Sequence, residues 1–238
     1  MKYTKGTLGL FVAILILGTS MNAFGFLGFG GTSWKEEVLL HDGSKIVVKR
    51  SVDRGGRHEI GQQPPIKEQS LTFTLPTTSE HIIWRSDYSQ DVGLADFMPI
   101  LLDIVQGTAY VVANPVGCLS YNKWGRPNPP YVVFKYDGKE WQRITLQDLP
   151  VEIKAPNLII SSPDNKVDRI GKRFVTADEV KKINSSLTQP EYKTILREPV
   201  KPGSYGSSVN CDERVYYNGA WIGPGDSIGR RMMDRKSK

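Results

Sequence analysis

The sequence contains few of the side chains that carry metal and thiol chemistry. Its 238 residues include only two cysteines and three histidines. Two isolated cysteines, without CxxC spacing or a nearby pair of histidines, do not make the ligand set of a metal site. We therefore expect no metal centre, and no motif in the chain indicates a cofactor.

Complete catalytic motifs are also missing. His58 and Glu59 begin like the zinc motif HExxH, but Gln62 stands where the second histidine should be, and the neighbouring glycines oppose a helix. Residues 203–206 resemble a GxSxG elbow, yet the serine comes one position too early. His58 and Glu59 remain as the candidate catalytic residues if the protein is a hydrolase.

Charge is missing from most of the N-terminal region. Lys2 and Lys5 precede an uncharged stretch that continues to Lys35, and small residues flank Phe24. A basic start, an apolar run of about ten residues and a small-x-small triplet are typical of a secretory signal peptide. We therefore expect residues 1–25 to be a signal peptide and the protein to be periplasmic or secreted.

An uncleaved anchor in the inner membrane is the alternative for the same segment. A membrane-spanning helix needs about 20 predominantly apolar residues, and the uncharged stretch is long enough. Several glycines and polar residues after Leu17 weaken both helix formation and insertion. This composition favours cleavage over anchoring.

The two cysteines, Cys118 and Cys211, predict a disulfide bond. In an oxidising compartment, an even number of cysteines pairs by default. The bond closes a long loop, and the loss of freedom in the unfolded chain stabilises the fold by roughly 4 to 5 kcal/mol in the entropy model.

The net charge of +6 does not indicate a nucleic-acid-binding protein. The last nine residues, 230–238, hold five bases against one acid. Without the signal and these nine residues, the chain has 24 bases and 24 acids. Attraction to phosphate needs a basic patch on a folded surface. We expect residues 230–238 to form a disordered basic tail. The alternative is a weak contact of this tail with an anionic membrane surface.

Turn signals between apolar stretches predict β-hairpins. Asp-Gly and Asn-Gly pairs supply the positive φ angles that tight hairpin turns require. These pairs are Asp42-Gly43, Asp137-Gly138 and Asn218-Gly219. Residues 71–75 alternate between apolar and polar, and residues 101–105 can pair with 109–112. The pattern predicts a single mainly β domain over residues 26–229, built as an antiparallel sandwich or an irregular barrel.

One region of the chain predicts helices. Thr176 with Glu179, and Thr188 with Glu191, have the spacing of capping boxes, and apolar residues follow each at helical intervals. We expect a small helical pair near residues 176–198. The outline also fits a helix-turn-helix, but an exported protein rarely meets DNA, so we expect no nucleic-acid partner.

Two loops have an unusual composition for connectors, because they concentrate charged and aromatic side chains with glycine or proline. They are residues 53–59 and 121–130. Rigid loops that present tryptophan, tyrosine and arginine are typical of recognition surfaces. The candidate binding residues are Arg54, Arg57, Tyr121, Trp124 and Arg126. The competing interpretation is that a disulfide-anchored, proline-rich loop only covers a sheet edge.

These loops also carry a resemblance. Residues 54–61 (RGGRHEIG), residues 121–131 (YNKWGRPNPPY) and the hairpin turn at 136–138 resemble uncharacterised exported proteins of Gram-negative bacteria. The resemblance implies an exported location. It brings no known activity, ligand or catalytic residue.

The sequence therefore predicts an exported, non-catalytic envelope or secreted protein that binds a protein or glycan partner. One alternative is a periplasmic hydrolase with a polar site around His58 and Glu59. The other is a purely structural component of the envelope. The distinction depends on whether the two unusual loops meet at one concave surface.

Overall fold

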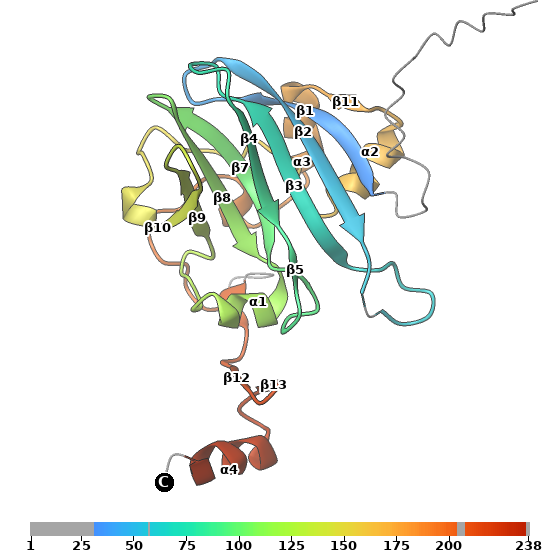
Figure 1. Cartoon of the computed structure of the whole chain (residues 1–238), viewed down its shortest axis with the longest axis vertical. Helices are drawn as coiled ribbons and strands as arrows, with labels where there is room; N and C mark the ends of the chain where they lie inside the picture. The colour runs from blue at the N-terminus through green and yellow to red at the C-terminus, as the bar shows by residue number, and fades with distance from the viewer. Residues whose placement is uncertain (1–30, 57, 204–207, 237–238) are drawn as a thin grey trace, which may run out of the picture. The chain divides into compact units, whose positions relative to one another are not determined.

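The computed structural model describes residues 31–56, 58–203 and 208–236, and the predicted signal peptide and Arg57 lie outside these ranges. Strands hold 36% of the residues and helices 20%, so the fold is mainly β, as predicted. The larger sheet has the strand order β11-β1-β2-β3-β4, and the second sheet has the order β10-β9-β8-β7 (Figure 1). All neighbours are antiparallel except β1 and β11.

The strands of the larger sheet are β1 (Thr32–Leu39), β2 (Lys45–Arg54), β3 (Ile66–Thr74), β4 (His81–Ser86) and β11 (Phe174–Val175). Those of the second sheet are β7 (Phe97–Val105), β8 (Thr108–Pro115), β9 (Val132–Tyr136) and β10 (Trp141–Ile144). Two small ribbons pair β5 (Tyr88–Ser89) with β6 (Leu94–Ala95) and β12 (Val215–Tyr217) with β13 (Ala220–Ile222). The helices are α1 (Gly117–Lys123), α2 (Pro163–Ile170), α3 (Ala177–Asn184) and α4 (Ser227–Lys236).

The predicted hairpins are confirmed. Asp42-Gly43 joins β1 to β2, Asp137-Gly138 joins β9 to β10, and Asn218-Gly219 joins β12 to β13. Asn218 and Gly219 have φ angles of 49° and 84°, which match the positive values that a two-residue turn needs. The pairing of β7 with β8 is confirmed as well.

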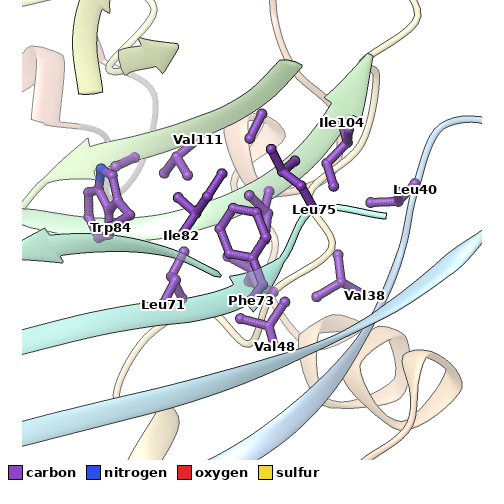
Figure 2. Close-up of a cluster of buried hydrophobic side chains, with 14 of the residues drawn as sticks. Val38, Leu40, Val48, Leu71, Phe73, Leu75, Ile82, Trp84, Ile104 and Val111 are labelled. Atoms are coloured by element: carbon purple, nitrogen blue, oxygen red, sulfur yellow. The ribbon is translucent and has the colours of Figure 1, made fainter. Parts of the chain in front are cut away.

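A hydrophobic core fills the space between the two sheets. Its side chains come from β1 to β4 on one side and from β7 to β9 on the other. Figure 2 shows Phe73 among Leu71, Val48 and Ile82, with Ile104 and Val111 coming from the second sheet. This contact between two faces makes the fold a sandwich.

A third layer covers the outer face of the second sheet. Ile100, Leu101 and Val112 point away from the main core and pack against Leu149 and Ile153 from the segment after β10. Because β7 is covered on both faces, seven of its nine residues are buried. Buried strands of this kind read as continuous apolar runs rather than as alternating ones.

The sheets do not close into a barrel, so that alternative is wrong. A closed barrel would need a backbone ladder between β4 and β7, the edge strands of the two sheets. At the start of β7, side chains from the larger sheet hydrogen-bond to the backbone instead. Gln69 Nε2 on β3 donates to the Phe97 carbonyl oxygen at 2.5 Å, and the Phe97 amide donates to Ser86 Oγ at 3.0 Å. These side-chain hydrogen bonds occupy both backbone groups of Phe97, the first residue of β7, so neither is free to pair with a neighbouring strand.

The predicted helical pair near residues 176–198 is confirmed only for its first helix. Thr176 and Glu179 form a capping box at the start of α3, as predicted. In the rest of the predicted range, residues 185–198, a single 3-10 turn forms at Pro190–Tyr192. Tertiary hydrogen bonds replace the second helix, because Tyr131 Oη donates to the carbonyl oxygens of Glu191 and Thr194, and the Ile195 amide donates to the Lys154 carbonyl oxygen.

Residues 230–236 of the predicted disordered tail belong to the helix α4, and residues 237–238 lie outside the described ranges. Asp226 starts α4, because its side-chain Oδ1 atom accepts a hydrogen bond from the Gly229 amide and its backbone carbonyl oxygen accepts one from the Arg230 amide. Side-chain capping of this kind supplies partners for the first amides of a helix. Within the described ranges, none of the helices has the length and apolar character needed to cross a membrane.

Candidate functional site

The loop predicted to bind a partner is instead tied into the fold. Tyr121, one of the candidate binding residues, is buried, with 2% of its surface exposed. Trp124 is partly buried and packs on Phe97 with 4.5 Å between the ring centroids. The Trp124 Nε1 atom is buried without a hydrogen-bond partner, so this donor is not presented at the surface.

The Arg126 side chain is also used for contacts within the fold. Its guanidinium donates to the Cys211 carbonyl oxygen at 2.7 Å and to Asn122 Oδ1 at 3.1 Å, and it lies 5.2 Å from the centroid of the Tyr121 ring. The predicted disulfide between Cys118 and Cys211 is present beside it. The loop therefore joins the second sheet to the C-terminal segment, which supports the structural interpretation of residues 121–130.

The other predicted loop does not form a catalytic site. Arg54 forms a bidentate ion pair with Asp164, in which Nε donates to Oδ2 at 2.5 Å and Nη2 donates to Oδ1 at 2.9 Å. His58 and Glu59 are exposed, and their hydrogen bonds go to the Gly56 carbonyl oxygen and to Gln62. Neither residue lines the clefts described below, so the geometry gives no support to a hydrolase site there.

The turn between β5 and β6 lies between the two loops. A Cβ atom at Gly56 would lie 3.2 Å from the Gly93 carbonyl oxygen, and Lys123 Nζ is 2.8 Å from Asp91 Oδ1. The two loops thus flank one turn at the same end of the sandwich. They contribute no residue to the main cleft.

The main cleft lies elsewhere and has a volume of about 610 Å³. Five parts of the chain line it: the end of β1 with His41, Asp103 of β7, the segment 152–157, α3, and residues 192–193. Pockets that hold small molecules commonly have volumes of about 300–1,000 Å³, mainly apolar walls and a few convergent polar groups. The cleft has this character, since leucine, alanine, proline and valine side chains form much of its wall.

His41 and Asp103 form the central polar pair of the cleft. His41 Nδ1 lies 2.8 Å from Asp103 Oδ1, and the His41 amide donates to Asp103 Oδ2 at 3.1 Å. The Ile104 amide donates to Oδ1 at 2.7 Å. The side chains of His41 and Asp103 are 19% and 4% exposed. Asp103 therefore fixes the orientation of the imidazole and leaves Nε2 as the ring nitrogen available to a ligand.

The environment favours the charged form of His41. The hydrogen bond with Asp103 raises the pKa of His41, with smaller contributions from Asp42 and Glu152, while burial opposes the rise. Burial raises the pKa of Asp103, and the hydrogen bonds from His41 and Ile104 counteract it. The pair therefore favours an imidazolium at the wall of the cleft more than an isolated histidine would, with the Asp103 carboxylate beside it.

Two asparagines hold the walls of the cleft together. Asn157 accepts from the Leu102 amide at 3.0 Å and donates to the carbonyl oxygens of Leu39 and Leu102 at 3.0 and 2.8 Å. Asn184 donates to the Leu158 carbonyl oxygen and accepts from the Ile160 amide. These amides replace a backbone ladder between the sheets and the third layer, so the cleft is built into a rigid frame.

Charged side chains of both signs surround the cleft. The cationic residues are Lys154, Lys181 and Lys193, and the acidic residues are Glu152 and Asp178. Lys193 Nζ donates to the Ser185 carbonyl oxygen at 2.8 Å. Burial raises the pKa of Tyr192 to about 12, so its hydroxyl stays neutral at physiological pH. With His41 protonated, the cleft lining carries a small excess of positive charge.

The cleft lacks the parts of a nucleophilic catalytic site. Within the ranges that the structure describes, no serine or threonine hydroxyl is hydrogen-bonded to His41, and no three histidine, cysteine or acidic side chains are grouped to hold a metal ion. A nucleophile and its base need to be within hydrogen-bond reach of each other.

The sequence analysis missed this site. His41 is adjacent to the Asp42-Gly43 turn, so the predicted hairpin accounts for its position and gives no reason to expect a ligand-binding residue there. Asp103 is the single charged residue within an apolar strand, and a carboxylate at a strand position that is otherwise buried was the signal available. Comparison with known proteins adds no further guide, because no family model, curated protein or solved structure matches this chain.

Proposed function

We propose that this chain is an exported, non-catalytic envelope or secreted protein that binds a partner through the cleft around His41. The observation that carries the proposal is the preorganised His41–Asp103 pair in a cleft of about 610 Å³. A cleft of this size accepts a small molecule or the end of a peptide or glycan chain, but not a broad protein surface.

The lining also favours one ligand chemistry. An apolar wall accommodates an apolar body, and the imidazolium with the neighbouring lysines favours an acidic group. The ligand we propose is therefore the acid-bearing end of a peptide or glycan. The basic and apolar N-terminal pattern, together with the disulfide, supports an oxidising compartment outside the cytoplasm.

A direct binding measurement tests this function. We expect short peptides with a free C-terminal carboxylate, or uronic-acid oligosaccharides, to bind the purified protein in titration calorimetry. His41→Gln should weaken this binding at least tenfold, while the variant keeps the circular-dichroism spectrum of the folded protein. His81→Gln is the matched control, because His81 is exposed and contacts the Thr74 hydroxyl rather than a carboxylate. Equal binding by wild type and His41→Gln would contradict the proposal.

A second candidate function follows from the same pair. A histidine held by a buried carboxylate is also the arrangement of a general base, which contributes about 100- to 10,000-fold to a rate. The base would then be His41 and not His58. Turnover of an ester or glycoside panel that disappears in His41→Gln, and persists in His58→Gln, would establish the hydrolase and replace the binding function.

A further inference from the structure

The C-terminal helix α4 leaves one apolar face uncovered. Ile228 and Met232 are 68% and 58% exposed. They are four residues apart in a helix, so they lie on the same face, one turn from each other. Exposed large apolar side chains grouped in this way mark an interaction site more often than single ones do.

The orientation of this face is fixed by the preceding hairpin. A Cβ atom at Gly229 would lie 2.9 Å from Ile222 Cγ1, so the backbone of α4 approaches β13 closely. Met233 and Ile222 line the same small hollow. One side of α4 is thus occupied by the hairpin, and Ile228 and Met232 lie on a neighbouring side that the hairpin does not cover.

The hairpin is in turn fastened to the body of the protein. The Asn122 side chain donates to the Asp212 carbonyl oxygen at 2.9 Å and accepts from the Arg214 amide at 2.8 Å. Trp221 Nε1 donates to the Asp91 carbonyl oxygen at 2.6 Å. Together with the disulfide at Cys211, these bonds hold the base of the hairpin on α1 and the β5–β6 turn.

The charge of α4 complements an anionic surface. The helix sequence SIGRRMMDRK contains four basic residues and one acid. Basic and apolar side chains combined on one short helix are typical of segments that lie in the interface of an anionic bilayer. A second copy of the chain is a poor occupant, because two helices with the same positive charge would repel each other.

We propose that α4 docks the protein on an anionic lipid surface, with Ile228 and Met232 entering the boundary between headgroups and acyl chains. The basic residues, among them the exposed Arg231, then lie at the level of the lipid phosphates. This inference is independent of the cleft, because no residue of α4 lines the cleft.

Vesicle sedimentation tests the proposal with the mature chain and its disulfide intact. We expect binding to vesicles of phosphatidylglycerol and phosphatidylcholine, much weaker binding to pure phosphatidylcholine, and a decrease as salt is added. Each basic residue near such a surface changes the partition coefficient by about fivefold. Arg231→Glu should therefore reduce binding more than tenfold.

The apolar contribution has its own variant and controls. Ile228→Ser combined with Met232→Ser should reduce binding about tenfold or more, since both side chains would lose burial in the lipid. Ile60→Ser and Lys139→Glu should have no effect, because these residues are exposed in loops elsewhere. Melting temperatures should stay unchanged throughout.

Several results would overturn the proposal. They are equal binding to neutral and anionic vesicles, an absence of binding to both, and full binding by the double serine variant. A concentration-dependent dimer that the double serine variant abolishes would also overturn it and would assign the face to a second copy of the chain.

Discussion

His41 shows how a single buried neighbour sets the behaviour of a side chain. Asp103 raises the pKa of His41 in the folded protein, whereas the unfolded chain has the ordinary value of about 6.5. A raised folded pKa means that protonation favours the folded state. The stabilisation is therefore complete below about pH 6.5 and is lost as the pH rises through the folded pKa.

This linkage gives a pH-dependent prediction. The stability advantage of wild type over His41→Gln should be largest below pH 6.5 and should shrink as the pH rises above it. Urea denaturation at a series of pH values measures the difference. His81→Gln should show no such trend, and a constant difference between wild type and His41→Gln would contradict the ion pair.

A second residue-scale prediction concerns the buried pair of Arg50 and Glu36. Their side chains are 1% and 0% exposed, with Arg50 Nη1 2.9 Å from Glu36 Oε1. Glu36 also accepts from Trp34 Nε1 and from the Ile159 amide. The pair thus links β1 and β2 to the segment that covers them.

Removing one partner leaves a buried, uncompensated charge, which costs about 3–5 kcal/mol. Arg50→Met should therefore lower the free energy of unfolding by that amount in urea denaturation. Arg85→Met on β4 is the control, because Arg85 is exposed and its loss should change stability by less than about 0.5 kcal/mol. Similar effects of the two substitutions would show that the buried pair contributes little.

At the scale of elements, the segment Gly117–Lys123 and the loop after it behave as structural cover. Trp124→Ala should lower the free energy of unfolding by about 2 kcal/mol or more, since the ring packs on Phe97 in the main core. Trp124→Phe should cost much less, because it keeps the ring contact and removes a donor that has no partner. An unchanged melting temperature in Trp124→Ala would contradict the structural interpretation and would support the interpretation of the loop as a binding surface.

The disulfide gives the second prediction at this scale. Cys118 and Cys211 are 93 residues apart, and closing a loop of this length stabilises the fold by roughly 4 to 5 kcal/mol in the entropy model. Replacing both cysteines with serine should lower the midpoint of urea denaturation accordingly. The loss should match the effect of a reductant on wild type, and a reductant without effect would contradict it.

The predictions from sequence succeeded where the determining chemistry is local. Asn218-Gly219 defines its turn through its own φ angles, and Thr176 with Glu179 caps α3 through contacts three residues apart. The second helix failed because Tyr131, some sixty residues away, competes for the carbonyl groups of Glu191 and Thr194. Turn and cap signals in the sequence contain no information about such distant partners.

For the whole molecule, the sandwich and the barrel share one strand pattern, so alternation could not separate them. In the folded chain, Gln69 and Ser86 hydrogen-bond to the backbone of Phe97, and these contacts between residues distant in the sequence cannot be predicted from alternation. The candidate site could not be predicted from the sequence for the same reason. His41 and Asp103 are 62 residues apart and meet only because β1 and β7 belong to facing sheets.

Export is a prediction about the whole molecule, and it can be tested directly. The N-terminal pattern predicts a mature chain that begins at or near Phe26, because signal peptidase cleaves after small residues such as Gly25. Intact-mass measurement and N-terminal sequencing of protein from envelope fractions check this. Full-length protein found only in inner membranes would show that the segment is an anchor.

The disulfide also determines what a protease could do to this protein. The loop between Cys118 and Cys211 contains α2, α3 and β9–β11, together with the cleft residues from Glu152 to Lys193, whereas His41 and Asp103 lie outside it. One backbone cut after α3, at residues 186–189, would leave two fragments joined by the sulfur bridge. A nicked molecule would therefore keep both sides of the cleft covalently connected and would separate into fragments only after reduction.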